Sequence, residues 1–209
     1  LGPVGTGIIY GIELRDGLLD QWRNNASGRV SLPLRLESVH LDHFPSLLPD
    51  SFYQAFTSLD LRNVHATDDQ TNALIRRLPH ATAVDISGAR VPALLTPPAA
   101  LLELPSLREV ELSGHGMLID QAIFDFFCRI PQLRHLDLSA NRLSDIIDTQ
   151  AVASRRWESL TLEGMGLERI PAWLAGLLPN HLYSLSLAEN RLTELPQSLL
   201  ANPRSHAAR

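Results

Sequence analysis

The sequence predicts an α/β solenoid, in which stacked strand–turn–helix units place a parallel β-sheet on the concave side and helices or turns on the convex side. Two observations lead to this prediction. A pattern of apolar residues recurs about every 25 residues along most of the 209-residue chain, a period typical of repeat architectures. Between the copies, several segments show the spacing of amphipathic helices and end at a proline.

The repeated unit is the frame L-x-x-L-x-L-x-x-N-x-L, which is the signature of leucine-rich repeats. Clear copies start at Leu133, Trp157 and Leu182, and Asn141 and Asn190 occupy the asparagine position in two of them. The second and third leucines share one face of a short strand, because side chains alternate with a period of two. One such strand cannot bury its apolar face alone, so stacked copies must cover one another. We expect the two asparagines to turn inward and bond the backbone of adjacent turns.

Four weaker copies extend the array toward the N-terminus and start at Leu107, Ala81, Phe56 and Leu36. The copy at Leu36, with Val39 and Leu41, is the least regular of them. The steps between the starts run from about 20 to about 26 residues, within the range of this repeat class. About seven leucine-rich repeats are therefore expected over residues 36–200.

Segments between the predicted strands are expected to form helices on the convex side. Residues 67–78 begin with Thr67 as an N-cap, continue with acidic residues and end in basic residues, an order that suits the helix dipole. Residues 120–130 have helical apolar spacing and stop at a proline. Shorter helical turns are expected within residues 171–178, 196–200 and 92–105.

The two ends of the chain depart from the frame. Residues 1–35 contain a glycine-punctuated β pattern and a short helical patch, and we interpret them as an N-terminal cap or the end of a preceding domain. Such a cap covers the apolar core and the unpaired strand edge at the end of a solenoid. Residues 201–209 are expected to be a frayed tail. Because the sequence starts at Leu1 without a signal-peptide pattern, we expect it to be part of a longer protein.

Composition narrows the classes of partner. A formal net charge of −5 and a pI of about 5.9 argue against binding to nucleic acids or anionic membranes, which requires clustered cationic side chains. No apolar run reaches the roughly 18 residues of a membrane-spanning helix. The single cysteine excludes an intrachain disulfide. We therefore expect a protein partner, with a basic one favoured, and leave the oligomeric state open.

The outward positions of the frame should form rows of side chains on the concave face, with about 4.8 Å between neighbouring strands. The central row carries four carboxylates in consecutive repeats, and two interpretations remain open: a docking stripe for a cationic partner, or a solvated face that uses a common residue of the frame. The candidate partner-binding residues on this face are His40, Asp60, Arg62, Asp85, Glu109, Glu111, His135, Asp137, Thr161 and Glu163.

No catalytic residue, metal ligand or cofactor is expected in this chain. Cys128 lies among phenylalanines on the predicted core side of a helix, whereas a reactive thiol needs an exposed electropositive setting. The sequence His40-Leu41-Asp42-His43 resembles a metal-ligand cluster, but His43 should point elsewhere, at a bend. There is no G-x-S-x-G nucleophile motif, and the glycine-rich start lacks the lysine of a phosphate-binding loop.

Residues 182–200 carry the continuation N-x-L-T-x-L-P, residues 133–143 carry the generic frame, and residues 13–17 read Glu-Leu-Arg-Asp-Gly. These features are similar to large Pseudomonas-type effectors of the novel E3 ubiquitin ligase family. The resemblance implies that the repeats select a host substrate, and that a separate C-terminal domain carries the nucleophilic cysteine. Cys128 matches no such catalytic motif, so that domain would lie outside this chain.

Two functions follow from these observations. The first is a substrate-recognition module of a bacterial effector, which the resemblance extends to a secreted E3 ubiquitin ligase acting in the host cytoplasm. The alternative is a non-enzymatic leucine-rich repeat scaffold, which would reside in the bacterial cytoplasm.

Overall fold

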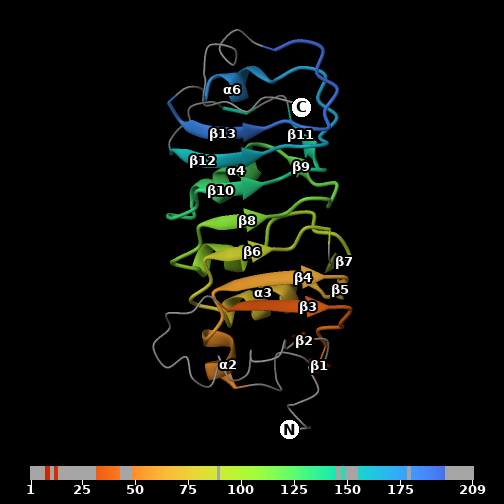
Figure 1. Ribbon diagram of the computed structural model, residues 1–209, viewed down its shortest axis with the longest axis vertical. Helices are drawn as coiled ribbons and strands as arrows, with labels where there is room; N and C mark the ends of the chain where they lie inside the picture. Colours follow the sequence, from red (N-terminus) through yellow and green to blue (C-terminus); the bar gives the residue numbers. More distant parts are fainter. Residues whose placement is uncertain are drawn as a thin grey trace. The chain divides into compact units, whose positions relative to one another are not determined.

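The computed structural model describes residues 8–9, 12–13, 32–42, 49–88, 90–144, 147–148, 155–177 and 180–195 (Figure 1). It confirms the predicted leucine-rich repeat solenoid, with short parallel strands joined by turns and helices. The chain forms two compact units, one of residues 1–94 with 98–107 and the other of residues 95–97 with 108–209. None of the helices among the described residues has the length and apolar character needed to cross a lipid bilayer.

The first unit contains three parallel strands with an antiparallel hairpin at one edge. Neighbours in its sheet follow the order β1 (Ile8–Ile9), β2 (Ile12–Glu13), β3 (Pro33–Glu37), β4 (Ser58–Arg62) and β6 (Ala83–Asp85). The hairpin β1–β2 meets β3 through the antiparallel pair Ile12 and Leu36, so it occupies the edge of β3. A small parallel sheet joins β5 (Val64–His65) to β7 (Arg90–Val91), and the helices of this unit are α2 (Asp50–Gln54), α3 (Asp68–Arg76) and the 3₁₀ helix η1 (Ala99–Glu103).

The second unit continues the same pattern with four parallel strands. These are β8 (Glu109–Glu111), β10 (His135–Asp137), β12 (Trp157–Thr161) and β13 (Leu182–Ser186), in that order. A second small parallel sheet joins β9 (Leu118–Ile119) to β11 (Arg142–Leu143), and the helices are α4 (Gln121–Cys128) and α6 (Ala172–Ala175). Equivalent positions of the frame pair with one another throughout, which confirms the register assigned from the sequence in these four repeats.

The register of the first repeat was predicted wrongly. Leu34 and Leu36 pair with Leu59 and Leu61 of the next strand, so this copy of the frame begins at position 31 and not at Leu36. The error has a simple cause, because the second half of the frame, L-x-x-N-x-L, has the same apolar spacing as its first half. The first strand therefore starts at Pro33, within the 1–35 segment interpreted as a cap.

A left-handed turn follows the strand in every repeat. The residue at the eighth position of the frame has a φ between 50° and 77° in all seven copies, and these residues are Ser38, Asn63, Gly88, Gly114, Ala140, Gly164 and Glu189. This conformation is disfavoured for residues with a Cβ atom. The corrected frame of the first repeat places Ser38 at this position, in agreement with its strand pairing.

The asparagines of the frame bond the backbone as predicted. The side-chain oxygen of Asn141 accepts hydrogen bonds from the amides of His115 and Met117, at 3.2 and 2.9 Å. Its side-chain nitrogen donates to the carbonyls of Leu112 and Leu138, both at 2.9 Å. Asn190 makes the equivalent four bonds two repeats later. These amides join each turn to the one before it.

The two longer predicted helices are confirmed. Thr67 caps α3 in a reciprocal capping box with Gln70, and Asp120 caps α4 by accepting a hydrogen bond from the amide of Ile123. The helix expected within 171–178 is the shorter α6, and the turn expected within 92–105 is η1. The helix expected at 196–200 lies outside the described residues, as does the 201–209 tail.

Candidate functional site

The exposed face of the strands carries most of the predicted partner-binding residues, but it is less acidic in the first unit than expected. Asp60 lies between two arginines, with Arg35 Nε at 3.6 Å and a terminal nitrogen of Arg62 at 3.2 Å. Arg35 is the residue of β3 that pairs with Asp60, the place that the sequence analysis had given to His40. Its positive charge therefore offsets the carboxylate from the neighbouring strand.

His40 itself lies beyond the strand. It forms an isolated parallel β-bridge with His65 of β5, and the two imidazole rings stack with their centroids 4.4 Å apart. Asp42 accepts a hydrogen bond from the side-chain amide of Gln70 at 2.8 Å, and His43 lies outside the described residues. Within the part of the chain that is described, no three His, Cys, Asp or Glu side chains come together as a metal site would require.

The aspartates of the frame have a structural contact. Oδ1 of Asp85 accepts a hydrogen bond from the amide of Ser87, and Oδ1 of Asp137 accepts one from the amide of Ser139, each at 2.9 Å. Both bonds span two residues and fix the end of a strand against the turn that follows. This contact explains why aspartate suits the frame whether or not a partner uses its charge.

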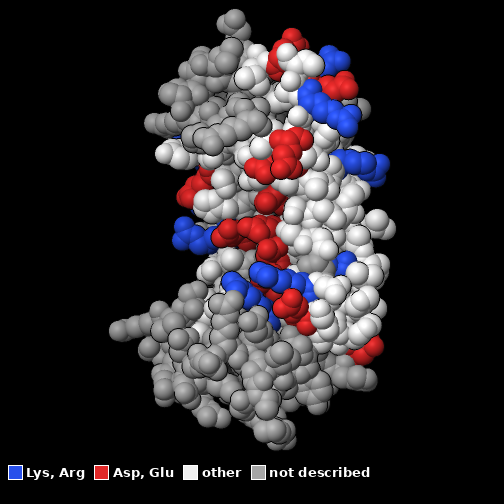
Figure 2. Space-filling model, turned by 45° about the vertical axis from the view of Figure 1, so that its right-hand side comes forward, with Lys and Arg blue, Asp and Glu red and all other residues white. Residues whose placement is uncertain are grey.

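In the second unit, carboxylates lie side by side on β8 and β10. Glu111 pairs in register with Asp137, and Glu109 with His135. Figure 2 shows acidic side chains gathered on one face of the molecule, with arginines among them. Thr161 follows Asp137 in the same row, on β12. Glu163 lies two residues after Thr161, outside this row, and accepts a hydrogen bond from the hydroxyl of Ser186.

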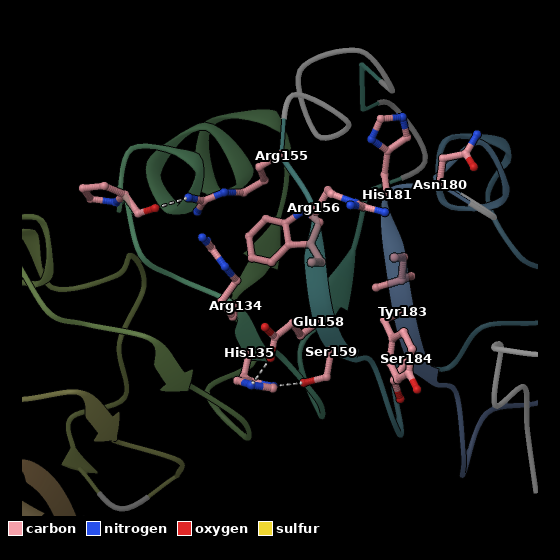
Figure 3. A pocket seen from close by; sticks show the side chains of 13 residues that line it. Arg134, His135, Arg155, Arg156, Glu158, Ser159, Asn180, His181, Tyr183 and Ser184 are labelled. Atoms are coloured by element: carbon pink, nitrogen blue, oxygen red, sulfur yellow. Dashed lines mark hydrogen bonds and ion pairs between the residues drawn. The ribbon is translucent and has the colours of Figure 1, made fainter.

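A hollow of about 980 Å³ opens at the start of β10, β12 and β13 (Figure 3). Thirteen residues of the second unit line it: Pro131, Arg134, His135, Arg155, Arg156, Trp157, Glu158, Ser159, Asn180, His181, Leu182, Tyr183 and Ser184. Its charged side chains are three arginines and one glutamate, with two histidines beside them. The hollow is therefore a cationic site next to an acidic face.

His135 ties the only carboxylate of this lining in place. Its Nε2 lies 3.0 Å from a carboxylate oxygen of Glu158, and its Nδ1 lies 2.8 Å from the hydroxyl of Ser159 (Figure 3). Bonds at both ring nitrogens fix the orientation of the imidazole. Of the predicted site residues, His135 is the one that reaches the hollow.

Arg155 stabilises the wall of the hollow through hydrogen bonds to the backbone. Its two terminal nitrogens donate to the carbonyls of Phe127, Ile130 and Pro131 at 3.0, 2.7 and 3.1 Å, at and just beyond the end of α4. Its guanidinium lies 5.2 Å from the ring centroid of Trp157. Burial lowers the pKa of Arg155, against the opposing effect of Cys128, and the neighbouring positive charge of Arg134 also lowers it.

Arg134 and Arg156 are the more accessible cations of the hollow. Arg156 is exposed, and half-buried Arg134 donates one terminal nitrogen to the carbonyl of Leu133 at 3.0 Å. In the described part of the chain, neither they nor Arg155 form an ion pair with a carboxylate. In the first unit every described arginine forms an ion pair with a carboxylate. These arginines are Arg35, Arg62, Arg76, Arg77 and Arg90.

This hollow was not predicted from the sequence, because the predicted site residues all came from the outward positions of the frame. A signal was available: Arg155 and Arg156 come directly before one copy of the frame, and Arg134 is the second residue of the copy before it. Cys128 also differs from expectation, because it is half-buried at the last position of α4. The buried face of that helix consists of Ile123, Phe124 and Phe127.

Comparisons with known proteins agree with this architecture. The model of the Leucine Rich Repeat family matches residues 132–150, and no curated protein matches the chain. Internalin C2 from Listeria monocytogenes is similar with a TM-score of 0.54 and 13% identity, over 85% of this chain and 79% of that one. A leucine-rich repeat protein from Leptospira interrogans is similar with a TM-score of 0.55 and 16% identity, over 91% of this chain and 56% of that one. Domains of this fold generally mediate protein–protein interaction and are typically non-catalytic scaffolds.

Proposed function

We propose that this chain binds a protein partner on the exposed face of its strands, and that basic groups of the partner meet the carboxylates of β8 and β10. The observation that carries the proposal is the register of the second unit, which places Glu111 beside Asp137 and Glu109 beside His135. Adjacent carboxylates repel one another, and a cationic side chain of a partner relieves that repulsion.

We further propose that the chain is the substrate-recognition module of a bacterial effector, with a secreted E3 ubiquitin ligase as the parent protein and its catalytic domain outside this chain. The repeat continuation at residues 182–200 supports this proposal by resemblance. A second feature is consistent with it: the chain contains no lysine, since all 18 of its cationic Lys and Arg residues are arginines. A recognition module without lysine offers ubiquitin no side-chain amine, so transfer would be directed to the bound substrate. The alternative is a non-enzymatic scaffold.

The test of protein binding is affinity capture from host-cell extract, followed by a Kd for the identified partner at low and high salt. We compare the wild type with Glu109→Gln/Glu111→Gln and with the control Asp125→Asn/Glu168→Gln, which removes the same charge from exposed positions elsewhere. The proposal expects about a tenfold weaker Kd for the first variant and little change for the control. Equal affinity of both variants would refute the acidic face as the docking surface.

The ligase and the scaffold are separated with the full-length parent protein. In a reaction with ubiquitin, activating enzyme and conjugating enzyme, a ligase transfers ubiquitin to the captured partner. Binding of the partner without any transfer would favour the scaffold.

A further inference from the structure

We propose that the hollow at the start of β10, β12 and β13 binds an acidic segment of the protein partner, with Arg134 and Arg156 as the residues that hold its carboxylates. This inference rests on the proposed function, because it concerns the same partner, but it concerns a separate surface. The residues that carry it are Arg134, Arg156, His181 and Tyr183, which Figure 3 shows around the hollow.

The size of the hollow fits a short peptide segment. Its volume of about 980 Å³ is at the upper end of the range of roughly 300–1,000 Å³ found for pockets that enclose small ligands. Its walls come from three successive repeats, at His135, Ser159 and Ser184, which pair with one another in register. A segment lying across the strands would contact all three repeats.

The charge of the hollow calls for an anionic occupant. Three guanidinium groups face a single carboxylate, that of Glu158, which His135 already holds at 3.0 Å. In the first unit each described arginine has a carboxylate within 3.6 Å, whereas in the second unit no described arginine forms an ion pair with a carboxylate of the described residues. Arg134 and Arg156 therefore differ from the arginines elsewhere in their unit in that they share one hollow, where an anionic occupant would bring carboxylates to both.

The three arginines of the hollow have two roles: Arg155 stabilises its wall, and Arg134 and Arg156 are available to bind a ligand. Arg155 directs its two terminal nitrogens to three carbonyls at and just beyond the end of α4, so it is committed to the fold. Exposed Arg156, and Arg134 with one bond to a carbonyl, retain N–H groups for a ligand. A guanidinium presents parallel N–H donors that match the two oxygens of a carboxylate. Tyr183, 64% exposed, adds a flat surface at the side of the hollow.

The surroundings favour a peptide over a nucleic acid. Glu109, Glu111 and Asp137 lie on the same unit, and the chain as a whole carries a net charge of −5, so a polyphosphate backbone is repelled on approach. A protein segment can carry charges of both signs, with acidic residues for the hollow and basic residues for the neighbouring face. This mixed pattern is the chemistry that we assign to the partner.

The inference is tested by fluorescence anisotropy with a labelled (Glu-Ala)₄ octapeptide, beside a labelled (Gln-Ala)₄ octapeptide and a labelled single-stranded RNA of similar length. We expect the acidic peptide to bind and the neutral one not to bind. Arg134→Gln/Arg156→Gln should weaken the acidic peptide by about tenfold or more. The matched control Arg142→Gln/Arg169→Gln removes two exposed arginines of the same unit outside the hollow and should leave the affinity unchanged. Circular dichroism verifies that both variants are folded.

Three outcomes overturn the inference: no binding of the acidic peptide, equal weakening in the two double variants, or tighter binding of the RNA than of the peptide. The captured partner separates this inference from the proposed function. If the partner binds the Arg134→Gln/Arg156→Gln protein as tightly as the wild type, the hollow is not used, while the acidic face stands on its own test. Loss of the partner in this variant, with retention in the control, supports the hollow as part of the interface.

Discussion

Replacement of Asn141 by alanine tests how the repeats are held together. In the wild type, the buried amide of Asn141 accepts hydrogen bonds from the amides of His115 and Met117 and donates to the carbonyls of Leu112 and Leu138. Alanine leaves two buried N–H groups without these acceptors, and each orphaned donor costs about 1–3 kcal/mol. We therefore expect the free energy of unfolding to fall by about 2–6 kcal/mol.

The control is Asn190→Ala, which removes the four equivalent contacts two repeats later. Asn190 is only half-buried, so water can replace its amide, and we expect a smaller loss of about 1–2 kcal/mol. Urea unfolding followed by circular dichroism gives both values. Hydrogen exchange at the amides of His115 and Met117 should accelerate in Asn141→Ala and not in Asn190→Ala. A loss below about 1 kcal/mol for Asn141→Ala, or equal losses in the two variants, would refute the reasoning.

Three further predictions concern the turns, a helix end and a buried tyrosine. Gly164→Ala should lower the free energy of unfolding by about 1–2 kcal/mol through backbone strain alone, because its φ is +60° and the nearest atom to an added Cβ lies 3.9 Å away. Ala140→Gly relieves the same strain and should not destabilise the protein in the same urea assay. Arg155→Met should speed hydrogen exchange in α4 and destabilise by about 1–3 kcal/mol, because three carbonyls lose their donors, and unchanged exchange in α4 would contradict this role. Burial raises the pKa of Tyr53 to about 12, against the opposing effect of Arg77, so spectrophotometric titration should show one tyrosine ionising late. Because Tyr53 ionises more easily in the unfolded chain, stability should fall as pH rises from about 10 toward 12, and Tyr53→Phe should lose that dependence.

Much of the fold could be predicted from the sequence because each repeat carries its own local signals. The apolar spacing around Leu136 and Leu160 defines strands that pair in the predicted register. The asparagine position of the frame predicts the inward amides, and Thr67 predicts the start of α3. These features depend on residues close together in the chain, so a pattern of 11 residues is enough to find them.

The first repeat shows where such patterns fail. Residues 36–41 fit the apolar spacing at the start of the frame, and residues 31–36 fit it except at Ser31. The pairing of Leu34 with Leu59 decides between the two registers. The choice changes the site, because it brings Arg35 beside Asp60 and moves His40 into the turn. The row of side chains predicted to be acidic therefore contains Arg35 beside Asp60, a cation that the pattern did not predict there.

Periodicity and short-range chemistry are enough to predict the repeat, the strand faces after the first repeat, the cap of α3 and the inward-turned asparagines. Which charges meet depends on how whole strands pair. Arg134 comes just before β10, Arg155 and Arg156 just before β12, and His181 just before β13. They surround one hollow because parallel stacking aligns the start of each strand with the next. Electrostatic contacts of this kind join residues about 25 positions apart, so they depend on the register of whole strands rather than on any local motif.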